Sequence, residues 1–195
     1  MGGLQGTPLR GGAWRPPSFL RCCITLLTHI FTIRNVNKEP SQGGSSMPSF
    51  ARKVSAYFIV KDAARAIDFY KEAFGATEVF RMTDPSDGRI GHAELRFGET
   101  LMMLADEYPD FGALSPDAIG GSPVTFHIDT ESTDAALAQA LSAGATMLRP
   151  ATDQSFGERV AQVLDPFGHR WMLSQTIEQV TPEEMQRRWN EDMSA

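Results

Sequence analysis

Hydrophobic and polar residues follow one order that occurs twice along this chain of 195 residues. In the first occurrence, a β-branched and aromatic run over residues 53–60 predicts a strand. Apolar residues at helical spacing then predict a helix that Asp62 caps and Gly75 ends. Three further strands are expected over residues 77–82, 90–97 and 100–105, with a turn at residues 84–88.

The same order returns after a connector of 16 residues, 106–121, which is rich in Gly and Pro and is expected to be a loop. The second occurrence predicts strands over 123–128, 146–148, 159–164 and 169–175, and a helix over 133–143. The tripeptide Gly75-Ala76-Thr77 recurs as Gly144-Ala145-Thr146, 69 residues later. A repeat of this length indicates two modules, neither of which can bury its sheet face alone.

The predicted fold class is therefore α+β, with two tandem βαβββ modules whose curved mixed sheets face each other around a cleft. Beyond the modules, Thr181-Pro182-Glu183-Glu184 resembles a capping box that opens a helix through Trp189. The apolar residues of that helix suggest packing against a neighbour. The expected organisation is a disordered leader and linker (1–48), one two-module domain (49–180, with modules at 53–105 and 122–176) and a C-terminal helix (181–195).

Charge and cysteine content narrow the function classes. The net charge is −6, which gives no electrostatic support for a nucleic-acid partner. Both cysteines, Cys22 and Cys23, lie before the modules, so the modules have no thiol for catalysis, a disulfide or a zinc site. This composition is consistent with a cytoplasmic protein.

Residues 1–46 differ from the rest, with five Lys/Arg and one acidic residue. Their apolar run, residues 22–33, is too short to span a bilayer, so no membrane association is expected. One interpretation is a disordered or mis-started extension upstream of Met47. A transit or signal peptide and a membrane anchor remain as alternatives.

The order of elements and several motifs resemble the vicinal oxygen chelate superfamily, which includes glyoxalases, bleomycin resistance proteins and extradiol dioxygenases, and more narrowly its PhnB-like branch. The resemblance covers residues 53 to about 176. The motifs that carry it are Ala66-Ile67-Asp68-Phe69-Tyr70, Phe74-Gly75-Ala76, Gly91-His92-Ala93-Glu94-Leu95-Arg96-Phe97-Gly98, Phe156-Gly157-Glu158-Arg159 and Asp165-Pro166-Phe167-Gly168-His169-Arg170-Trp171.

The resemblance implies where a metal would bind. Metalloenzymes of the superfamily take one ligand near the start of each module's first strand and one from each fourth strand. Here these positions fall on Ser55, Met103, Pro123 and Met172, with Met102 in place of Met103 if the strand slips by one. A hydroxyl, two thioethers and a proline ring do not suit a divalent cation of this class. We therefore expect no metal and no cofactor, and no metal-dependent glyoxalase or dioxygenase activity.

Period-two alternation tells which side chains share a face with those positions. The expected ligand-binding residues are mostly apolar with a few polar groups, as in small-molecule pockets: Tyr57, His92, Glu94, Met103, Thr125, His127, Arg159 and Met172. His92, Glu94 and His127 are also the candidates for acid–base catalysis. The alternative roles are structural. His92 and Glu94 would hydrogen-bond to each other's neighbours or to solvent on an exposed strand face, and His127 would be a structural histidine. Arg159 would form a surface ion pair, and the methionines would lie in the core. Trp171 points away from Met172 and is expected to pack against the helices.

Three functions remain open at this point. The first, which we favour, is a metal-free protein that binds a small organic molecule in the cleft, and the resemblance implies that it is a homodimer. The second is a lyase- or isomerase-type enzyme that uses His92, Glu94 or His127 as acid, base or relocated metal ligand. The third is an interaction module whose cleft is filled by its own side chains.

Overall fold

The computed structural model describes residues 53–194 of a chain that divides into two units, residues 1–50 and 51–195. The predictions for the leader lie outside the described residues. Module one holds β1 (Tyr57–Val60), α2 (Ala63–Phe74), β2 (Thr77–Thr83), β3 (Ile90–Phe97) and β4 (Thr100–Asp106). Module two holds β5 (Thr125–Asp129), α4 (Thr133–Ser142), β6 (Thr146–Asp153), β7 (Glu158–Leu164) and β8 (Arg170–Thr176). Helix α5 (Pro182–Asp192) follows.

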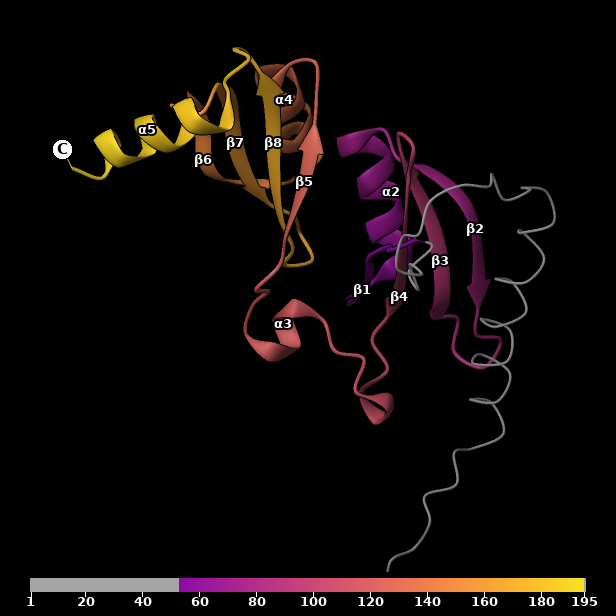
Figure 1. Ribbon diagram of the computed structural model, residues 1–195. Coiled ribbons are helices and arrows are strands. Elements are labelled where there is room, and N and C mark those ends of the chain that lie inside the picture. The colour runs from indigo at the N-terminus through magenta and orange to yellow at the C-terminus, as the bar shows by residue number, and fades with distance from the viewer. Residues whose placement is uncertain (1–52, 195) are drawn as a thin grey trace, which may run out of the picture. The chain divides into compact units, whose positions relative to one another are not determined.

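Each module forms one four-stranded mixed sheet, and the two sheets have the same topology (Figure 1). The strand order is β1-β4-β3-β2 in the first sheet and β5-β8-β7-β6 in the second. The first and last strands of each module pair in parallel, and the other pairs are antiparallel. The predicted fold class, two βαβββ modules, is confirmed.

Several predicted boundaries were wrong. Strand β1 begins at Tyr57 rather than at residue 53, because β4, its neighbour among the described residues, pairs with it from Tyr57 onward. Strand β5 begins at Thr125, after Pro123, which has no N–H for the ladder. Strand β6 extends to Asp153 and passes through Pro150, which an edge strand tolerates at an irregular register.

The connector between the modules is not a plain loop. It contains the short helices η1 (Pro109–Phe111) and α3 (Pro116–Ile119), each with Pro at its first turn. An isolated bridge also pairs Tyr108 with Ala113. The Pro and Gly residues that predicted a loop instead start and end these two turns, since Pro suits the first helical position and Gly the position after the last.

Helix α2 is fixed at both ends by the predicted residues. Asp62 accepts a hydrogen bond from the backbone N–H of Arg65 at 3.1 Å, and Gly75 ends the helix in the left-handed conformation with φ +64°. The buried Asp106, at the end of β4, also accepts from the N–H groups of Ala63 (2.8 Å) and Ile90 (2.7 Å). This carboxylate joins the helix start to two strands of its own module.

The modules meet through their helix-bearing faces. Trp171 of β8 is 1% exposed and lies 4.7 Å, between ring centroids, from Phe74 of module one and 4.7 Å from Phe126. Phe58 of β1 lies 5.1 Å from Phe126 in the same way. The prediction that Trp171 packs against the helices is confirmed, and the core is shared by both modules.

A buried carboxylate accounts for the Asp-Pro-Phe-Gly-His-x-Trp motif. Asp165 is 3% exposed, and its Oδ2 accepts from the Tyr70 hydroxyl at 2.8 Å and from the Trp171 indole N–H at 2.9 Å. Its Oδ1 accepts from the backbone N–H groups of Phe167 and His169, both at 2.9 Å. Because Tyr70 belongs to α2, this carboxylate connects module two to module one. Burial, and then the neighbouring carboxylate, raise the pKa of Tyr70 well above its ordinary value.

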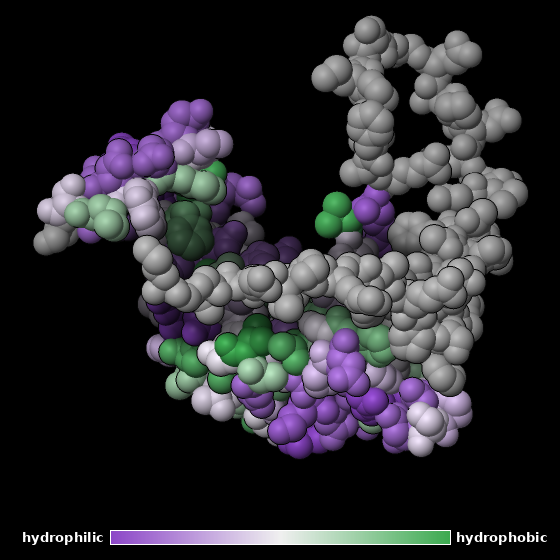
Figure 2. Space-filling model, turned by 90° about the horizontal axis from the view of Figure 1, so that it is seen from below, coloured by the Kyte–Doolittle hydropathy of each residue, from purple (hydrophilic) through white to green (hydrophobic). Residues whose placement is uncertain are grey.

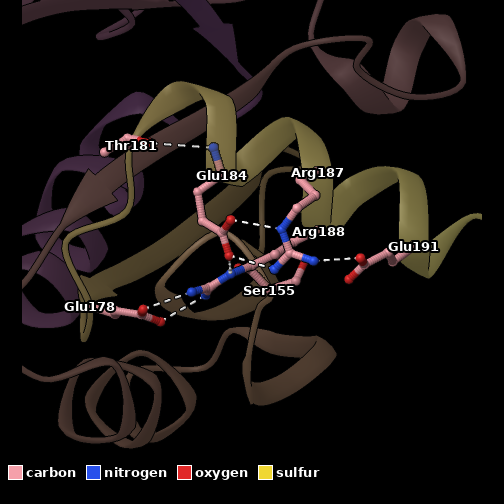
Figure 3. Close-up of polar contacts among 7 residues, drawn as sticks. All are labelled: Ser155, Glu178, Thr181, Glu184, Arg187, Arg188 and Glu191. Carbon is pink, nitrogen blue, oxygen red and sulfur yellow. Dashed lines mark hydrogen bonds and ion pairs between the residues drawn. The ribbon is translucent and has the colours of Figure 1, made fainter.

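Helix α5 is held against module two by Arg188 (Figure 3). The Arg188 guanidinium donates to the Ser155 carbonyl at 3.0 Å and pairs with Glu178 at 2.8 Å. Arg187 pairs instead with Glu184 and Glu191 of its own helix. The hydrogen bonds from Arg187 and Arg188 lower the pKa of Glu184 to about 2.

The start of α5 follows only half of the predicted capping box. The Thr181 hydroxyl accepts from the N–H of Glu184 at 3.3 Å, as expected. The Glu184 carboxylate turns to the two arginines rather than back to Thr181. The apolar residues of α5 remain exposed, with Trp189 at 56%. Figure 2 shows hydrophilic residues over much of the coloured surface, with hydrophobic residues in separate patches.

These contacts predict different outcomes for two neighbouring arginines. Arg188→Ala should release α5 from Ser155 and Glu178, so its backbone amides should lose protection against hydrogen exchange along the helix. Arg187→Ala removes only contacts within the helix and should change exchange far less. Mass-spectrometric hydrogen exchange of the two variants measures this difference. Equal protection in both would contradict the role given to Arg188.

No helix among residues 53–194 has the length and apolar character needed to cross a membrane.

Candidate functional site

The sheet face without a helix in each module, which we call the open face, carries most of the predicted site residues. On the first sheet, Tyr57 pairs with Met103, and Met103 pairs with Glu94, so these three residues share one face. The neighbours on the opposite face, Ala93 and Leu95, are fully buried under the helix. The predicted alternation of β3 is therefore confirmed.

His92 is at the centre of a polar group on the first open face. Its Nδ1 lies 3.2 Å from the Tyr57 hydroxyl, and its Nε2 lies 3.9 Å from Glu94 Oε1. Both His92 and Glu94 are buried, at 6% and 7% exposed. The exposed strand face of the structural alternative is therefore wrong for these two residues, whereas its hydrogen bond to a neighbouring residue is present between His92 and Tyr57. Burial lowers the pKa of His92, although Glu94 opposes this shift.

The lowered pKa predicts a pH dependence of stability. His92 has a lower pKa in the folded protein than its ordinary value of about 6.5, so the unfolded chain binds the proton more readily. The contribution of His92 to the free energy of unfolding is present above about pH 6.5. It is lost as the pH falls from there toward the pKa of the folded state, by at most about 1.4 kcal/mol per pH unit. The free energy of unfolding, measured in urea at pH 7.5 and at pH 5.5, should fall less between these two pH values for His92→Gln than for the wild-type protein. An equal loss in both proteins would refute the prediction.

The second open face carries the other half of the predicted set. His127 of β5 pairs in register with Met172 of β8, and Met172 pairs with Gln162 of β7. His127 Nε2 lies 2.6 Å from the hydroxyl of Ser174, which is 2% exposed. Thr125 lies on the same face at the start of β5. His127 thus has the hydrogen-bond partner that its structural alternative requires.

Arg159 is the one predicted ligand contact that the structure places elsewhere. On β7 it shares the helix-bearing face with the buried Ala161, away from Met172. Its guanidinium pairs with Asp134 of α4 at 2.8 Å and with Asp153 of β6 at 2.6 Å. The alternative, a surface ion pair, describes this geometry, because both arms of the guanidinium are engaged. Arg159 is therefore not part of the proposed binding site.

The two open faces do not close over each other within one chain. Tyr57, His92, Glu94 and Met103 lie together on the first sheet, and Thr125, His127 and Met172 lie together on the second. The modules contact each other on the other faces, through α2, α4 and the shared aromatic core. Two half-sites are present, one in each module.

The residues present do not fit the metal that the superfamily's enzymes hold. Met103 and Met172 lie at the centre of the two open faces, in register with Tyr57 and His127. Ser55 and Pro123 lie just before β1 and β5. Among residues 53–194 no group of three or more His, Cys, Asp or Glu side chains is arranged to hold a metal ion. Thioethers are soft, weak donors for a hard or borderline divalent cation.

Sequence reasoning missed two residues of the first open face. Phe80 pairs with Glu94, and its ring centroid lies 5.6 Å from that of His92; Met82 pairs with His92. A bulge between Glu78 and Phe80 shifts the alternation of β2 by one residue. Simple counting from Thr77 therefore assigns these two side chains to the wrong face.

Comparison with known proteins identifies the family. The family model of the Glyoxalase/Bleomycin resistance protein/Dioxygenase superfamily matches residues 53–173. The uncharacterised protein Rv0887c of Mycobacterium tuberculosis is 40% identical over 148 residues, which span 74% of this chain and 86% of that protein. The X-ray structure of the Arabidopsis thaliana gene product At5g48480 has a TM-score of 0.53 at 27% identity, covering 64% of this chain and 98% of that one.

More distant structures show the fold alone. A glyoxalase/bleomycin resistance protein/dioxygenase from Nocardioides has a TM-score of 0.52 at 20% identity, over 82% of this chain and 97% of that one. A PhnB protein from Bacillus cereus has a TM-score of 0.51 at 16% identity, over 64% of this chain and all of that one. The family-model match over residues 53–173, together with the repeated modules and the motifs, leads to one conclusion: the chain belongs to the Glyoxalase/Bleomycin resistance protein/Dioxygenase superfamily.

Proposed function

We propose that this protein is a PhnB-like member of the superfamily that binds a small organic molecule without a metal ion. The observation that carries this proposal is the pair Met103 and Met172, which occupy the central positions of the two open faces. Polarisable thioethers beside aromatic and a few polar side chains favour contact with an organic molecule. The PhnB-like assignment rests on the motifs of both modules taken together.

The complete pocket, in this proposal, forms in a homodimer. Each open face offers one half of a concave site, and the two faces of a single chain are not closed over each other. Pairing the first open face of one chain with the second open face of another would bring His92 and Met103 opposite His127 and Met172. Sedimentation velocity across a concentration series tests this arrangement, and a monomer at all concentrations would contradict it.

A ligand screen tests the binding function. Protein treated with EDTA should be stabilised against heating by one or more compounds of a drug-sized library. Met172→Glu places a charge on the second open face and should weaken such a compound at least about tenfold, a loss of about 1.4 kcal/mol. Met147→Glu makes the same change at an exposed residue outside that face and should leave binding unchanged. A library without binders, together with stabilisation by added metal, would exclude the proposal.

A second candidate function rests on His92. A buried imidazole with a lowered pKa, 3.2 Å from a tyrosine hydroxyl, is neutral at pH 7 and suits a general base. This alternative predicts that a compound found in the screen is converted to product by the wild-type protein and not by His92→Gln. Nuclear magnetic resonance of the compound incubated with each protein decides between binding and catalysis.

A further inference from the structure

A groove of the described residues lies mainly outside the two predicted half-sites. It has a volume of about 970 Å³, and we call it the junction groove because both modules line it. Module one contributes the end of α2 and the turn between β3 and β4. Module two contributes the residues after β5 and the first turns of α4. Of the eight residues predicted to bind ligand, only His127 lines it. Its volume is within the range of small-molecule sites.

The floor of the junction groove is aromatic. Phe74, Phe97 and Phe126, all partly exposed, surround the buried Trp171, with ring centroids 4.7, 5.6 and 4.7 Å from that of Trp171. These rings come from both modules, so the floor exists only where the modules meet. Aromatic faces attract an organic cation through their negative quadrupole, and they also bury its apolar groups.

The rim of the junction groove is acidic. Glu99, Asp129 and Glu131 line it and are exposed, while no Lys or Arg is among the lining residues. Within residues 53–194 these three carboxylates take part in none of the ion pairs, in contrast to Asp134, which lies nearby on α4 and pairs with Arg159. The net negative charge at the rim is therefore left for a ligand of opposite charge.

We propose that the junction groove binds an organic cation with an aromatic or bulky apolar body. The aromatic floor would take the body and the delocalised charge, and the three carboxylates would favour the cation over a neutral or anionic molecule of the same shape. This site is separate from the cleft proposed above, because it lies mainly between the helix-bearing faces. The aromatic floor and the acidic rim together determine the ligand class, because the floor suits an apolar body and the rim suits a positive charge.

A pair of ions of nearly equal shape tests the charge preference. Isothermal titration of the full-length protein with tetraphenylphosphonium and with tetraphenylborate compares a cation with an anion of the same geometry. The cation should bind at least about tenfold more tightly, a difference of about 1.4 kcal/mol. The double variant Asp129→Asn, Glu131→Gln should remove most of this preference, whereas Asp110→Asn, an exposed aspartate outside the groove, should keep it.

Two tryptophan substitutions on α4 locate the bound cation. Ala135 lines the groove and Ala138 does not, and both are exposed. Ala135→Trp should block tetraphenylphosphonium, and Ala138→Trp should not. Equal binding of the two ions, no binding of either, or loss of binding in Met172→Glu instead of Ala135→Trp would each overturn the proposal. None of these results depends on whether the open faces bind their own ligand.

Discussion

Replacing Asp165 by alanine should lower the free energy of unfolding by about 3–5 kcal/mol, because four buried donors lose one acceptor group. The donors are the Tyr70 hydroxyl, the Trp171 indole and two backbone N–H groups. The expected loss is smaller than the sum of four penalties for unsatisfied buried donors, because the variant also removes a charge whose burial is itself unfavourable. Urea unfolding followed by circular dichroism measures the change.

Two further variants make this prediction specific. Asp165→Asn keeps Oδ1 for the backbone donors but places an amide N–H₂ opposite the Trp171 indole, so it should lose less stability than alanine. Asp110→Ala, at an exposed aspartate, should change stability by no more than about 0.5 kcal/mol. If Asp165→Ala costs no more than Asp110→Ala, the carboxylate does not connect the modules as described.

Replacing Trp171 by alanine should cost about 3–5 kcal/mol, since it leaves a large cavity at the centre of the shared core. The side chain is 1% exposed and contacts rings of both modules. The same unfolding experiment on Trp189→Ala, which removes a tryptophan that is 56% exposed on α5, should show a much smaller loss. Equal losses in the two variants would show that the modules do not share one core.

The sequence predicted what depends on local pattern. The cap at Asp62, the end at Gly75 and the alternation of His92 with Ala93 each follow from the preferences of a few neighbouring residues, and the structure agrees with them. The repeat predicted two modules with the same strand order. Even the outward direction of Met103 and Met172 follows from period two, because neither β4 nor β8 contains a bulge.

The sequence did not predict what depends on tertiary contacts. Asp165 looked like an ordinary turn residue, because its partner Tyr70 lies 95 positions away. Phe80 was assigned to no face, since the bulge in β2 depends on pairing with β3. The junction groove could not be foreseen because its floor combines rings of both modules. Alternation also shows which face of its own sheet a residue occupies, but it does not show which other sheet covers that face. The open faces were therefore expected to meet within the chain, which alternation could not test.

Metal content of the purified protein tests the central claim most directly. Cells grown with added zinc, nickel and iron should yield protein that holds far less than one equivalent of any of these after gel filtration, as measured by inductively coupled plasma mass spectrometry. Met103→Ala with Met172→Ala should give the same result, since thioethers are not expected to retain these ions. One tightly held equivalent in the wild-type protein would contradict the account, because a coordinating site would then exist despite the methionines at both central positions.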